Sequence, residues 1–196
     1  MRLKVNPLGF AAAALMMFLA LEREPPWWRL SLGEGLLSFN ASPFKMSLTV
    51  LGQEVLPPIV EYLTLGAWLV VVVGAVLMIV GSLSTRAWSK SLMSFGLSKL
   101  AWEVGGVVAA GVLVYLIAGP YLGALPIPMG GVEVVEHTMP LLAGEGVVKL
   151  KMAQEAGQVL VTIPVASVLT ERFYLAVAAL VACIAARLYQ GRLVKA

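Results

Sequence analysis

The sequence predicts an α+β membrane protein, in which a four-transmembrane-helix bundle carries an extracellular antiparallel β-sheet built from both external loops. Three observations predict this fold class. The 196 residues are 60% hydrophobic and 13% charged, with a mean hydropathy of +0.90, which is more apolar than a soluble core of this size can bury. Four apolar runs approach the length of a membrane-crossing helix. Other segments alternate apolar and polar residues, as strands do.

We expect a single integral membrane domain over residues 1–196, with helices at about residues 5–21, 59–81, 97–118 and 171–188. A crossing of about 30 Å needs about 20 apolar residues, so the first run is short. Its basic start and apolar core also fit a cleaved signal peptide. Phe18 and Ala20 do not form the small-x-small cleavage pattern, and an uncleaved helix is therefore favoured.

The third run contains closely spaced small residues. Gly105, Gly106, Ala109 and Ala110 form overlapping small-xxx-small pairs, which let helix backbones approach closely in lipid. We predict that these four residues are helix-packing positions.

The orientation is predicted from the basic residues near the helix ends, which favour the cytoplasmic side. Glu residues outnumber Lys and Arg on the opposite side. Both termini of this multi-pass cell-membrane protein are therefore expected in the cytoplasm, and the net charge of +3 gives no reason to expect nucleic-acid binding. The cytoplasmic basic residues are Arg2, Lys4, Arg86, Lys90, Lys99, Arg187, Arg192 and Lys195.

The external cap is expected to comprise residues 22–58 and 119–170. Alternation predicts strands at residues 44–50, 148–152 and 158–163, and more weakly at 27–32, 35–40 and 131–136. Five or six such strands could form one antiparallel sheet. Its apolar face would need a cover, provided by the sheet folded on itself, by the helix tops or by another subunit.

The chain resembles the claudin-like four-helix membrane proteins in topology. Their first external segment carries a Trp, followed by Gly-Leu-Trp and two cysteines. Here Trp28 is followed by Gly35, Leu36 and Leu37, and the only cysteine is Cys183. The resemblance implies association through the cap and no enzymatic activity.

Glu103 is the only carboxylate inside a predicted crossing. An intramembrane acid suggests proton or cation movement. Lys99 lies one turn earlier, where the helix start and the basic loop stabilise a carboxylate without further function. The second reading is favoured.

His137 and Met139 are weak candidates for a metal site, because His with Met suits copper. No second His and no Cys lies nearby, so no metal is assigned. An exposed polar strand end is the favoured interpretation.

Several tryptophans are predicted to anchor the chain at the membrane interface, where Trp is enriched. Trp27 and Trp28 follow the first helix, whereas Trp88 and Trp102 lie near the start of the third. Asn40, in the sequence Asn-Ala-Ser, is a glycosylation candidate on the predicted external side.

The function predicted from the sequence is a non-enzymatic membrane scaffold or accessory subunit. It would associate with itself or with a larger complex in the lipid bilayer through its sheet. The alternatives are a small oligomeric channel or transporter using Glu103, and a metal or redox accessory protein using His137 and Met139. No nucleophile cluster, cofactor motif or phosphate loop is recognisable. The absence of Asp and the scarcity of Asn and Cys suggest a thermophile.

Overall fold

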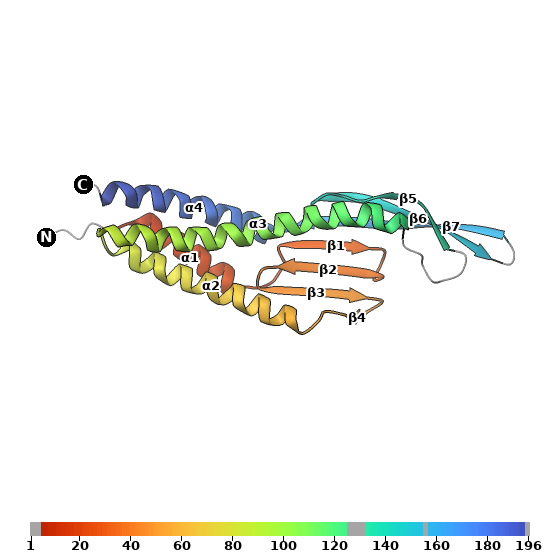
Figure 1. The fold of residues 1–196 in the computed structure, drawn as a ribbon, viewed down its shortest axis with the longest axis horizontal. Helices are drawn as coiled ribbons and strands as arrows, with labels where there is room; N and C mark the ends of the chain where they lie inside the picture. The colour runs from red at the N-terminus through yellow and green to blue at the C-terminus, as the bar shows by residue number, and fades with distance from the viewer. Residues whose placement is uncertain (1–4, 125–131, 155–156, 195–196) are drawn as a thin grey trace.

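The computed structural model describes residues 5–124, 132–154 and 157–194; the basic residues Arg2, Lys4 and Lys195 lie outside these ranges. Four helices pack together at the end of the molecule where α1 begins and α4 ends, and a sheet forms the other end (Figure 1). The helices are α1 (Pro7–Leu21), α2 (Ile59–Ser82), α3 (Ala87–Ala124) and α4 (Glu171–Leu193). The strands are β1 (Trp28–Leu32), β2 (Leu37–Ser42), β3 (Lys45–Val50), β4 (Gln53–Glu54), β5 (Val132–Thr138), β6 (Gly144–Gln154) and β7 (Gly157–Leu169).

Helix α1 begins with an Asn cap and a proline. The Asn6 side-chain oxygen accepts a hydrogen bond from the Gly9 backbone N–H at 3.1 Å, and Pro7 occupies the first turn. Both features favour a helix start. The helix has 15 residues, a rise of about 22 Å, which is less than the hydrocarbon thickness of about 30 Å.

Three helices are long and apolar enough to cross a membrane: α2, the first part of α3 over residues 87–117, and α4. Helix α4 begins at Thr170, whose hydroxyl oxygen accepts from the Arg172 backbone N–H at 3.2 Å. The same hydroxyl donates to the Pro26 carbonyl at 2.6 Å. This bond fixes the start of α4 to the segment that enters β1.

Helix α3 is much longer than predicted. Its 38 residues rise about 57 Å, nearly twice the hydrocarbon thickness. It starts at Ala87 rather than near residue 97, and it continues through Gly119 and Pro120 to Ala124. Its first turns are helical because Ser89, Met93 and Gly96 form a buried stripe within the Ser-rich, basic stretch.

The prediction of a four-transmembrane-helix bundle with a sheet from two external loops is wrong. Only three of the four helices meet the length and hydropathy of a crossing. Moreover, α3 does not end below the sheet but runs beside it (Figure 1) and contacts β5. The seven-stranded antiparallel sheet, whose strands lie between helices in the chain, is therefore built together with a helix.

The sheet has the order β4-β3-β2-β1-β7-β6-β5, with every neighbouring pair antiparallel. The two sequence segments that supply strands meet at one seam between β1 and β7. There Trp28 pairs with Leu169 and Leu32 pairs with Val165. A single sheet consequently spans both segments.

One face of the sheet, here called the inner face, is apolar and lies along α3 (Figure 1). It includes Trp28, Leu30 and Val165, which belong to the same buried cluster as Val104 and Val107 of α3. The sequence predicts that this apolar face needs a cover, and in the structure α3 packs against the part of the sheet that includes β5.

Glycines permit a close contact between the backbones of α2 and α3. A Cβ on Gly96 of α3 would lie 2.7 Å from the Gly74 carbonyl oxygen of α2, closer than such atoms can approach. This contact neighbours Met16 and Met78 in the core. Helices α2 and α3 therefore pack backbone to backbone.

Candidate functional site

The other face of the sheet, here called the outer face, carries most of the polar side chains. Cross-strand pairing places Ser47, Asn40, Arg29 and Val168 in one row across β3, β2, β1 and β7. Because side chains alternate along strands, these residues point away from the face that α3 covers. The outer face is thus the surface open to a ligand or partner.

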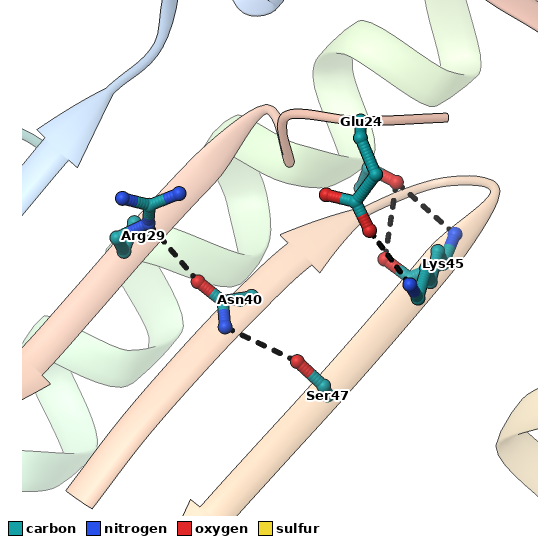
Figure 2. Close-up of polar contacts among 6 residues, drawn as sticks. Glu24, Arg29, Asn40, Lys45 and Ser47 are labelled. Atoms are coloured by element: carbon teal, nitrogen blue, oxygen red, sulfur yellow. Dashed lines mark hydrogen bonds and ion pairs between the residues drawn. The ribbon is translucent and has the colours of Figure 1, made fainter. Parts of the chain in front are cut away.

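A chain of hydrogen bonds crosses three strands of this face (Figure 2). Arg29 Nε donates to Asn40 Oδ1 at 3.2 Å, and Asn40 Nδ2 donates to Ser47 Oγ at 3.2 Å. The bond orients the Arg29 guanidinium through Nε. Among the described residues, its two terminal nitrogens have no hydrogen-bond acceptor.

An ion pair closes one side of the same region (Figure 2). Lys45 Nζ lies 2.6 Å from Glu24 Oε1, joining the start of β3 to the segment between α1 and β1. Both side chains are exposed, so the pair contributes about 0–1 kcal/mol to stability. The main consequence of this ion pair is that the opposite charges of Lys45 and Glu24 offset each other in this region.

These residues surround a polar cavity of about 320 Å³, here called the polar chamber. Its walls include Arg23, Glu24, Arg29, Asn40, Lys45 and Glu54. The volume lies at the lower end of the range for small-molecule pockets, about 300–1,000 Å³.

A second cavity of about 730 Å³ adjoins the chamber and shares Arg23, Lys45 and Glu54 with it. This cleft runs between β3 and the first half of α2, and Glu61 and Thr64 line it beside its apolar residues. The Arg23 guanidinium lies 5.2 Å from the ring centre of Trp68, and Trp68 Nε1 donates to the Ala20 carbonyl at 2.8 Å. The apolar wall residues are Phe44, Met46, Leu56, Val60 and Leu65.

Beside the chamber, strand β7 presents an apolar row on the outer face. Leu160 is 58% exposed and Val168 is 52% exposed, with exposed Pro164 between them. Charged residues of neighbouring strands flank this row. Lys149 pairs with Glu136 at 2.5 Å on one side.

Trp27 and Trp28, which are predicted as interfacial anchors, have buried side chains in the structure. They are 2% and 1% exposed. The Trp27 ring packs edge-on against Phe44. Trp28 Nε1 donates to Ser167 Oγ at 2.8 Å and to the Leu142 carbonyl at 3.1 Å.

The other two predicted anchors, Trp88 and Trp102, are exposed on α3, and Trp102 is 76% exposed. Trp102 lines a shallow groove of about 430 Å³ together with Gly105, Gly106 and Ala109. A Cβ added at Gly105 or Gly106 would meet nothing within 4 Å. These predicted packing positions therefore make no close contact within the described chain, and Ala110 is partly buried beside them.

Glu103 and His137 lie apart from the polar chamber. Glu103 is partly buried on α3, beside the stripe formed by Leu100, Val104 and Val107. His137 pairs with buried Val148 on the inner face, and Met139 packs against the core. Within residues 5–124, 132–154 and 157–194, no three His, Cys, Asp or Glu side chains cluster as metal ligands do.

Asn40 lies in the middle of β2 and takes part in the polar chain. Its Nδ2, the atom that would carry a glycan, donates to Ser47. A glycan there would displace this bond and occupy the chamber. Glycosylation of Asn40 stays a prediction.

Sequence reasoning missed the polar chamber because its residues come from distant parts of the chain. Arg23, Arg29, Asn40 and Glu54 form no motif in the sequence. The available signal was alternation: within predicted strands, positions 29, 40 and 47 were polar on one face. Recognising the site required the pairing register.

The chain matches no protein-family model, no curated protein and no solved structure. The resemblance to claudin-like proteins therefore stays a prediction.

Proposed function

We propose that this chain is a non-enzymatic, multi-pass protein of the cell membrane that serves as a scaffold or accessory subunit. It associates with itself or with a larger membrane complex through the outer face of its sheet. The observation that carries this proposal is the exposed apolar row on β7. It lies in the middle of a sheet whose neighbouring strands are charged.

The membrane location is supported by the three helices that are long and apolar enough to cross. α1 begins and α4 ends at one end of the molecule (Figure 1), where the α2–α3 connection also lies. Arg86 lies in this connection and Arg192 in the last turn of α4. Because basic residues favour the cytoplasm, we expect this end to face it.

The partner surface is supported by the distribution of residues around the apolar row. Protein interfaces commonly combine an apolar centre with a polar rim. Leu160 and Val168 supply apolar centre positions, while the Lys149–Glu136 pair and Arg29 lie on adjacent strands of the same face. Leu160, Pro164 and Val168 share one face of β7, with Thr162 between the first two, and exposed apolar side chains grouped in this way favour an interaction site.

The test introduces a charge into the row. Val168→Glu should abolish co-purification of partners from native membranes, or reduce the oligomer to a monomer in mild detergent. Burying a carboxylate in an interface costs free energy even beside Arg29 on the neighbouring strand, because the charged pair must also be desolvated. Multi-angle light scattering of the purified protein and mass spectrometry of co-purified chains provide the measurements.

Val55→Glu is the matched control, because Val55 is 55% exposed but lies outside the outer face of β7. It should leave association unchanged. The proposal is contradicted if the parent protein is a monomer that co-purifies with nothing. It is equally contradicted if both variants associate as the parent does.

A further inference from the structure

We propose that the polar chamber and the adjoining cleft together bind one amphiphile, with a phosphate diester headgroup in the chamber and its apolar chain in the cleft. This inference is independent of the partner surface on β7. It uses the continuity of two cavities, of which the cleft carries most of the apolar wall residues, and their position at the ends of α1 and α2.

The chamber has donors suited to a phosphate. Arg29 is oriented by its Nε bond to Asn40, which leaves both terminal guanidinium nitrogens able to donate. Arg23 forms part of the same wall and is positioned by the Trp68 ring. Arginine donors placed in this way suit bidentate recognition of phosphate oxygens.

The charges of the chamber favour a ligand with one negative charge. Glu24 is offset by Lys45 at 2.6 Å. Within the chamber wall, Arg23 and Arg29 then share one remaining acid, Glu54, while Glu61 lines the adjoining cleft. The resulting excess of one positive charge complements a phosphate diester, which carries one negative charge.

The cleft supplies apolar wall residues for the chain of the ligand, and Glu61 and Thr64 of α2 also line it. It opens from the chamber along Phe44 and Met46 on the sheet side, and along Val60 and Leu65 on α2. Its larger volume, about 730 Å³, accommodates a glycerol backbone and the first part of an acyl chain. Leu65 is itself exposed, so the cleft is open toward the surface of α2 that would face lipid.

An amphiphile fits this arrangement better than a free anion. A free phosphate would occupy the chamber only and leave the cleft unfilled. A headgroup without charge would leave two arginines without acceptors. The predicted class is therefore a phospholipid whose headgroup carries one negative charge.

The experiment uses the full chain purified in a nonionic detergent, with binding counted by native mass spectrometry. Three probes are compared: dioctanoyl-phosphatidylglycerol, dioctanoylglycerol and inorganic phosphate. The phospholipid should bind at least about tenfold more tightly than either other probe, because each of those lacks one half of the recognised structure.

Two sets of variants locate the site. Arg29→Gln and Arg23→Gln should each weaken phospholipid binding by about tenfold. Leu65→Gln should weaken it less, because one apolar wall position is lost. Arg86→Gln is the control, since Arg86 is an exposed arginine in the α2–α3 connection, at the opposite end of the molecule. The Arg86→Gln variant should bind the phospholipid as tightly as the parent protein does.

Each alternative result overturns part of the proposal. Equal affinity for dioctanoylglycerol would refute headgroup recognition, and equal affinity for inorganic phosphate would refute recognition of an amphiphile. If Arg29→Gln behaves as Arg86→Gln does while gel filtration shows it folded, the chamber is not the site. If the protein did not associate through strand β7, the lipid-binding results expected here would stay the same, so the two proposals can fail separately.

Discussion

Two networks centred on asparagine lie at opposite ends of this molecule. Near the chain termini, Asn6 Nδ2 donates to Gln190 Oε1 at 3.0 Å and to the Ala186 carbonyl at 2.9 Å. Gln190 Nε2 donates to the Ser84 carbonyl at 2.6 Å and to Ser89 Oγ at 2.8 Å. At the other end, Asn40 joins Arg29 to Ser47 on the outer face of the sheet.

The two networks differ in how deeply their side chains are buried and in whether all of their hydrogen-bonding groups have partners. Asn6 and Gln190 are fully buried, and every side-chain amide group has a partner. This network connects α1 and α4 with the α2–α3 connection and stabilises the fold. The Asn40 network is partly exposed and ends at guanidinium nitrogens that can still donate. A satisfied network holds structure together, whereas an unsatisfied one at a cavity can bind.

The largest expected effect comes from breaking the buried network. Gln190→Leu removes one acceptor of the Asn6 Nδ2 amide and the donor to the Ser84 carbonyl and Ser89 Oγ in the core. At about 1–3 kcal/mol for each unsatisfied group, the free energy of unfolding should fall by about 2–4 kcal/mol. Thermal unfolding in detergent, followed by circular dichroism, measures the change.

Tyr189→Leu is the control for this substitution, because Tyr189 is the exposed neighbour of Gln190. Its effect should stay within about 0.5 kcal/mol. A Gln190→Leu protein no less stable than Tyr189→Leu would show that the buried network does not hold the helices.

A smaller effect is expected from a methyl group at the helix contact. Gly96→Ala places a Cβ against the Gly74 carbonyl, so α2 and α3 must separate, at a cost of about 1–3 kcal/mol. Gly105→Ala on the same helix meets nothing within 4 Å, and should be neutral or stabilising by up to about 1 kcal/mol. Equal melting temperatures for the two variants would contradict the close contact.

The smallest effect is expected on the outer face. A double-mutant cycle with Glu24→Gln and Lys45→Gln should give a coupling energy below about 1 kcal/mol, which decreases as salt is added. The Arg172–Glu22 pair is the comparison, because Arg172 is more buried than Lys45. Its coupling should be the larger one, and the reverse order would contradict the expectation that burial strengthens an ion pair on this molecule.

The strands could be predicted from the sequence more fully than the helices. Alternation at residues 44–50 predicted β3, and the runs at 148–152 and 158–163 lie inside β6 and β7. Alternation reports which face a side chain takes, and this is a local property. The pairing of β1 with β7 joins residues about 140 positions apart, and no local pattern encodes it.

Helix α3 shows why the fold class was wrong. Its basic, Ser-rich start has the composition of a loop, and Gly119-Pro120 that of a helix end. Packing overrode the first local signal, since Ser89 and Met93 are buried against the other helices. The polar chamber was missed for a related reason: Arg23, Arg29 and Lys45 meet only after α1, β1 and β3 are in place.

The single seam between β1 and β7 also sets an order of events during synthesis. Strands β1 to β4 can pair as soon as residue 54 has emerged, but β1 has no partner on its other side until residue 169 follows. Over that interval the nascent chain carries an open strand edge, which favours pairing with other chains. Completion of the sheet therefore depends on the last third of the polypeptide, immediately before α4 is made.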